Sequence, residues 1–188
     1  MVTAGREKSE ADETGRVGIE PISDRWRFET GPPINGMFHE IVDQSDVTGR
    51  PDDDSDEAID ATALLAAFEA ALVDAIDAAG HDRVVAATPL DEETVDATAA
   101  GDVRGLTLEE GVSVLAAANG RETSPMVAEL RDHLLMGMAT AVLDVDTIAA
   151  SIDADLTGQE VQQTLEGRAT MTLEQLADIM AVIERRKP

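Results

Sequence analysis

The residues of this chain best suited to recognition chemistry lie between 157 and 168, in the segment TGQEVQQTLEGR. A glutamine amide can pair with both hydrogen-bonding groups that adenine presents in the major groove of DNA, whereas arginine and threonine can contact phosphate. The segment therefore predicts a helix that reads double-stranded DNA. Its candidate contact residues are Thr157, Gln159, Gln162, Gln163 and Arg168.

Three cations end the last helical segment of the chain: Arg185, Arg186 and Lys187. They are candidate phosphate contacts, which position a protein on DNA without giving it sequence preference. The negative end of a helix dipole also favours positive charge at this place, so a purely structural role is the alternative.

The composition is strongly acidic, with 188 residues and a formal net charge of -25. Lys8 and Lys187 are the only lysines, and Ala, Val, Asp and Glu dominate. This composition resembles that of proteins from extremely halophilic archaea, where molar salt screens the repulsion between surface charges. The alternative is an acidic surface that binds a basic partner.

The acidity also weighs against DNA binding. Glu160 and Glu166 lie among the glutamines, and few cations are present to offset them. High salt would remove most of the affinity gained by releasing counterions from DNA. A structural helix with merely exposed glutamines is therefore the second interpretation of segment 157–168.

Nothing in the sequence predicts catalysis, a metal or a cofactor. The chain has no cysteine, and His39, His81 and His133 do not have metal-ligand spacing. Phosphate-binding loops and nucleophile motifs are absent, so we expect no enzyme. The longest nearly apolar run, 134–143, is too short for a bilayer span, and no signal peptide is visible, so we expect a cytoplasmic protein without membrane contact.

Helical periods dominate from residue 60 onward, and no alternating strand pattern appears, which predicts an all-α fold. Thr107, Thr157 and Thr172 each precede a Glu or Gln by three residues, the spacing of a capping box. Ser124 is expected as the N-cap of another helix, with Pro125 at its first position. The expected helices span 61–80, 82–88, 91–101, 107–118, 124–143, 144–152, 157–167 and 172–186.

Two of these helices are long. The first should bury a stripe formed by Leu65, Phe68, Leu72 and Ile76. Helix 124–143 is apolar almost all round in its second half, which predicts that it is central and buried.

The order of long, short, short and medium helix occurs twice, offset by about 65 residues. Val95 and Val161 each lie six residues before a glycine, and a TLE triplet follows at 107–109 and 172–174. This pattern resembles the helix-turn-helix domains of the lambda repressor and Cro type. The resemblance implies two tandem helix-turn-helix-like modules that share a core through their long helices.

The chain departs from that pattern in both copies. Pro89 stands where the family usually turns on glycine, and the segment before residue 157 is two residues longer than the turn of the first copy. The first copy also carries four carboxylates on its would-be recognition helix, which predicts a packing module with a solvated acidic face. These carboxylates belong to Asp91, Glu92, Glu93 and Asp96.

From Met37 onward, RDHLLMGMATAVLDVDTIA and EGRATMTLEQLA are similar to a haloarchaeal family of small acidic proteins of unknown function. The expected organisation is a disordered, acidic N-terminal segment over 1–59, a first module over 60–120 and a second over 121–188. Met37 is a candidate for the true initiator. The leading hypothesis is a DNA-binding transcriptional regulator; the alternative is a non-enzymatic adaptor that binds a protein partner or forms a homodimer.

Overall fold

The computed structural model describes residues 60–187, and within that range all helices and strands assigned are α-helices. The predicted all-α fold is therefore confirmed. The expected N-terminal segment 1–59 and the candidate initiator Met37 lie outside the described residues. The helices are α2 (Ala61–Ala79), α3 (His81–Ala87), α4 (Glu92–Ala99), α5 (Leu108–Asn119), α6 (Thr123–Ala141), α7 (Val145–Ala149), α8 (Gly158–Leu165) and α9 (Leu173–Arg186).

Local side-chain caps start most of these helices where the sequence places them. Thr107, Thr157 and Thr172 each complete a capping box, in which the threonine and the third helical residue satisfy each other's backbone N–H groups. The predicted start of α6 is wrong: the helix begins at Thr123 after Glu122, and no side chain caps it. Ser124 therefore lies inside the first turn.

The long helices α2 and α6 match position by position at an offset of 62 residues. Leu64, Phe68 and Leu72 of α2 are buried, and so are their counterparts on α6. Leu64, rather than the predicted Leu65, belongs to the buried stripe of α2, since Leu65 is only partly buried. The counterparts on α6 are Met126, Leu130 and Leu134.

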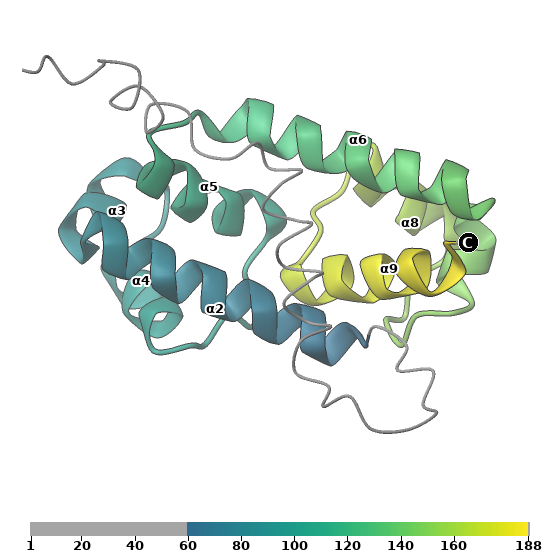
Figure 1. Cartoon of the computed structure of the whole chain (residues 1–188), viewed down its shortest axis with the longest axis horizontal. Coiled ribbons are helices and arrows are strands. Elements are labelled where there is room, and N and C mark those ends of the chain that lie inside the picture. Colours follow the sequence, from purple (N-terminus) through teal and green to yellow (C-terminus); the bar gives the residue numbers. More distant parts are fainter. Residues whose placement is uncertain (1–59, 188) are drawn as a thin grey trace, which may run out of the picture. The chain divides into compact units, whose positions relative to one another are not determined.

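The packing of the four longest helices repeats around an approximate two-fold axis. Helix α2 packs on both α5 and α9, and α6 packs on the same two helices, so that α5 and α9 lie between the long ones (Figure 1). One continuous hydrophobic core results. The division into modules at residue 120 remains a prediction, because helices from both sides of that point share this core.

Backbone hydrogen bonds join the starts of α5 and α9 at this axis. Leu108 N–H donates to the Met171 carbonyl at 2.8 Å, and Leu173 N–H donates to the Leu106 carbonyl at 2.9 Å. These two bonds form an isolated antiparallel bridge between Thr107 and Thr172. The two TLE triplets of the sequence repeat therefore meet in space.

Helices α5 and α9, and not α6, are the central helices among those described. Each has eight buried residues, and at Gly111 of α5 an added Cβ would lie 3.2 Å from Leu173 of α9. The prediction that α6 is central and buried is wrong, because one side of it faces outward with Leu135 and Met136 exposed. Its inner side approaches α9 closely at Gly137, where an added Cβ would lie 2.8 Å from Ile183.

Candidate interaction surfaces

The glutamines predicted to read DNA lie on α8, which turns its apolar side inward. Val161, Thr164 and Leu165 are buried, whereas Gln159 and Gln162 are exposed and Gln163 is partly buried. The side chains of Gln159 and Gln162 are therefore both accessible on α8.

Several candidate DNA contacts are already engaged within the chain. The Thr157 hydroxyl accepts from Glu160 N–H and donates to its carboxylate, and this contact holds the pKa of Glu160 below its ordinary value. Gln162 Nε2 donates to Glu166 at 2.8 Å, and Arg168 forms an ion pair with that same carboxylate. Binding to DNA would have to replace these contacts.

The C-terminal cations lie on a different helix. Arg185 and Arg186 are exposed at the end of α9, where they make no hydrogen bond or ion pair within residues 60–187 other than the weak attraction of Arg185 to Asp178. Lys187 is partly buried, pairs with Glu184 and lies over Gly137 of α6. No hydrogen bond or ion pair of the described residues joins this group to the glutamine face of α8.

The connections before the two candidate recognition helices differ more than the sequence indicates. Residues 88–91 join α3 to α4, whereas residues 150–157 join α7 to α8. The second connection is twice as long, and a helix-turn-helix turn normally has three or four residues. Asp146 of α7 lies against Gly158, the first residue of α8, where an added Cβ would meet the Asp146 carboxylate.

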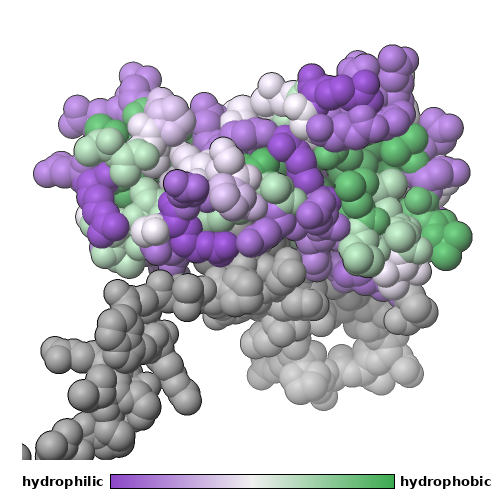
Figure 2. Space-filling view, turned by 90° about the horizontal axis from the view of Figure 1, so that it is seen from above, coloured by the Kyte–Doolittle hydropathy of each residue, from purple (hydrophilic) through white to green (hydrophobic). Residues whose placement is uncertain are grey.

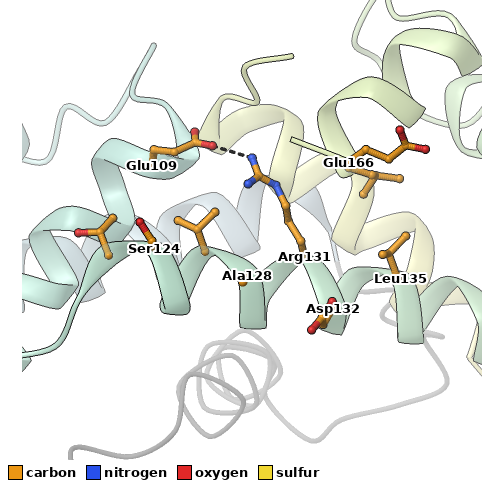
Figure 3. Close-up of a pocket in the computed structure, with 10 residues that line it drawn as sticks. Glu109, Ser124, Ala128, Arg131, Asp132, Leu135 and Glu166 are labelled. Carbon is orange, nitrogen blue, oxygen red and sulfur yellow. Dashed lines mark hydrogen bonds and ion pairs between the residues drawn. The ribbon is translucent and has the colours of Figure 1, made fainter. Parts of the chain in front are cut away.

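A hollow of about 460 Å³ lies beside α6, between the start of α5 and the end of α8. Figure 3 shows Arg131 reaching from α6 toward Glu109, with Leu135 and Glu166 farther along the same side. The Arg131 guanidinium pairs with Glu109 at 2.6 Å. It also lies over Gly167, which has a left-handed backbone (φ 71°) and where an added Cβ would lie 2.9 Å from the Arg131 guanidinium.

Exposed apolar side chains continue from this hollow along α6. Leu135 is 46% exposed, Met136 69% and Val142 90%. Together with the exposed Ala128 and Ala139 they form a surface that we call the α6 stripe. Figure 2, which looks onto the molecule from above Figure 1, shows hydrophobic side chains gathered at the right.

Sequence reasoning missed the α6 stripe, although a signal was present. The run 134–143 is apolar on more sides than a helix needs to pack on a core, and we interpreted the excess as central burial. No sequence pattern predicts the contact between Arg131 and Glu109, because these residues are 22 positions apart and only the tertiary fold brings them together.

Within residues 60–187, no cluster of three or more His, Asp or Glu side chains is placed to hold a metal ion. None of the helices in that range has the length and apolar content needed to cross a membrane. His81 Nε2, at the start of α3, lies 2.9 Å from the Asp96 carboxylate of α4, but not in hydrogen-bonding geometry.

From residue 60 to residue 187 the fold is all-helical and built on a repeated four-helix pattern. The chain belongs to the DUF5791 family, a family of unknown function, whose model matches residues 64–186. No curated protein and no solved structure matches the chain.

Proposed function

We propose that this chain is a non-catalytic interaction protein that docks another protein on the α6 stripe. The observation that carries the proposal is the difference between the outward faces of α2 and α6. At the positions of α2 that correspond to Met136 and Ala139, the chain has Asp74 and Asp77, both exposed. The fold thus accommodates carboxylates at these places, so packing alone does not require apolar residues on α6.

Exposed apolar surface of this kind is a common mark of a binding site. Burial of apolar area on docking contributes roughly 25 cal/mol per Å² removed from water. Methionine suits such a surface because its flexible, polarizable side chain adapts to different partners.

Val142 supports the same conclusion from the backbone. It ends α6 in the left-handed conformation, with φ 53°, where glycine is the usual residue. A β-branched residue is strained there, and this valine is 90% exposed, so it gains little from packing. Its side chain is explained if it contacts a partner.

Site-specific photo-crosslinking in cells tests the proposal. A photoreactive amino acid in place of Met136 should join the chain to one protein, whereas the same group in place of Asp74 should not. The crosslinked protein, once purified, should bind the full chain, and Leu135→Asp should weaken that binding at least tenfold.

The crosslinking pattern decides whether the α6 stripe is a docking surface and whether the partner is a second copy. A crosslink common to Met136 and Asp74, or none at either, would contradict docking on the α6 stripe. A crosslinked product of twice the chain mass would identify the partner as a second copy, which is the homodimer considered from the sequence.

DNA binding through α8 is the second candidate function, favoured by the exposed amides of Gln159 and Gln162. Under this second proposal, the chain is a transcriptional regulator. Helix α8 reads adenines, and phosphates are contacted by Arg168, Arg185, Arg186 and Lys187. The ion pairs of Arg168 and Lys187 with neighbouring glutamates weigh against it.

Chromatin immunoprecipitation of the tagged chain, beside a Gln162→Ala, Gln163→Ala variant, tests this candidate. Discrete peaks that disappear in the variant would establish α8 as a recognition helix. Enrichment no higher than in untagged cells would leave α8 as a structural helix.

Either activity fits a salt-rich cytoplasm as the working compartment. The acidic excess is tolerated where salt screens it, and the cysteine-free sequence needs no oxidising compartment. Fractionation of cells followed by immunoblotting would check this assignment.

A further inference from the structure

The α6 stripe has one charged residue in its middle. Asp132 follows Ala128 by one helical turn and precedes Met136 by another, and it is exposed. Its carboxylate makes no hydrogen bond or ion pair within residues 60–187, in contrast to Glu109, Glu129 and Glu166, which all pair with arginines.

Asp132 lines two hollows. One is the hollow of about 460 Å³, which it shares with Leu135, and the other is a hollow of about 230 Å³, which it shares with Glu129, His133 and Met136. In Figure 3 the Asp132 side chain points away from the Arg131 guanidinium, on the other side of α6. The nearest cation of its own helix therefore does not neutralise it.

A partner that covers the α6 stripe must remove this carboxylate from water. Burial of an unpaired carboxylate is costly, and the cost is offset only by a hydrogen-bonded cation. From the unpaired Asp132 between the apolar side chains of the α6 stripe, we infer that the docking partner is an amphipathic α-helix that places an arginine or lysine among its apolar residues. The inference rests on the proposed docking function of α6.

The shape of the stripe favours a helix as the occupant. From Ala128 to Ala139 it runs about 16 Å along α6, the length of three helical turns. The small side chains of Ala128 and Ala139 allow another helix to approach, and an amphipathic helix presents its anchors at the matching spacing.

A second copy of the chain fits this surface poorly. Pairing two α6 stripes would bring acidic residues of one copy toward those of the other, and like charges at an interface disfavour association. Arg121 and Arg131 cannot serve as the missing cations, because they already pair with Glu129 and Glu109.

Fluorescence anisotropy with three synthetic helical peptides tests the inference. All three share an apolar face of leucine and alanine, and at one position within that face they carry Arg, Gln or Glu. The full chain is titrated in a buffer in which circular dichroism shows it folded. We expect the Arg peptide to bind at least tenfold more tightly than the Glu peptide, with the Gln peptide between them.

An Asp132→Arg variant should reverse this order, and Asp132→Asn should remove the difference between the Arg and Glu peptides. Asp74→Arg, on the matching outward side of α2, is the control and should leave the order unchanged. Circular dichroism of each variant checks that the fold is intact.

Equal binding of the three peptides, or an order that Asp132→Arg does not change, would overturn the inference. Failure of all three peptides to bind would overturn it as well. In either case the crosslinking at Met136 decides separately whether α6 is a docking surface.

Discussion

Thr107 and Thr172 face each other across an antiparallel backbone bridge, although 65 residues separate them in the sequence. Each is at the same time the N-cap of its own helix, α5 or α9. The bridge joins the two helix starts by backbone hydrogen bonds, which leaves both threonine side chains free to cap. Two local sequence signals thus coincide with the approximate two-fold axis of the fold.

Replacing either threonine by alanine should remove a cap without touching the bridge. We expect Thr107→Ala and Thr172→Ala each to lower the free energy of unfolding by about 1 kcal/mol, the usual cost of losing such a cap. Urea denaturation followed by circular dichroism measures the loss. Serine at the same positions should retain most of the stability, and equal losses for serine and alanine would contradict a capping role.

Much of the helical framework could be predicted from local sequence, because caps and periodicity are local. The three capping boxes and the helix ends at Gly80, Gly101 and Gly167 all appear where expected. The start of α6 could not be predicted in the same way, since Ser124 and Pro125 offer a good N-terminal signal that the structure does not use.

The candidate site was predicted less completely. Exposure of Gln159 and Gln162 followed from helical periodicity, and the contact from Gln162 to Glu166 has the i, i+4 spacing that a helix brings together. The α6 stripe was missed because an apolar run has the same appearance whether it faces a core or a partner. Only the packing of α5 between α2, α6 and α9 shows which side of α6 remains uncovered.

A reversed charge at Glu69 should stabilise the fold. Glu69 of α2 corresponds to Arg131 of α6, and it lies over Gly101 as Arg131 lies over Gly167. The counterpart of Glu109 is Glu174, one of whose carboxylate oxygens is buried without a hydrogen-bond partner. We therefore expect Glu69→Arg to form a second ion pair and to raise stability by roughly 0.5–1 kcal/mol, measured by thermal unfolding.

The control for this change is Glu69→Gln, which removes a negative charge but supplies no cation. If Glu69→Arg is no more stable than Glu69→Gln, the correspondence between the two sides of the axis does not extend to these charges.

Val142→Gly should raise the stability of the chain and weaken its binding to the docking partner. Glycine adopts the left-handed conformation without the steric cost that valine has there, about 1 kcal/mol or more, and little packing is lost because the side chain is exposed. We expect a more stable chain with weaker binding to the partner captured through Met136. Urea denaturation and a binding titration on the same sample measure the two effects, and a variant that binds as well as the parent chain would show that Val142 lies outside the docking surface.

The carboxyl group of Asp102 should titrate far below the normal range. Arg104 donates two side-chain hydrogen bonds to it at 2.8 Å, and these bonds, with a weaker one from the Arg104 backbone, lower its pKa from 3.8 to about 2. A depressed pKa in the folded state contributes stability above the ordinary value, and this contribution is lost as the pH falls from about 3.8 toward 2. Carbon-13 NMR of the carboxyl group follows the titration, and Arg104→Gln should return the pKa toward its ordinary value.

Asp178 should show the opposite pH dependence. Burial is the main cause that raises its pKa, with additional repulsion from Asp153, whereas Arg185 opposes the shift. Because the folded state holds this proton more tightly than the unfolded chain, the ionised carboxylate destabilises the fold above its raised pKa, and the effect disappears as the pH falls below the ordinary value. We therefore expect Asp178→Asn to unfold at a higher temperature than the parent chain at pH 7, with a difference that shrinks on acidification. Arg185→Gln should raise the pKa of Asp178 further in NMR titrations, and an unchanged pKa in that variant would show that Arg185 points into solvent and is available for other contacts.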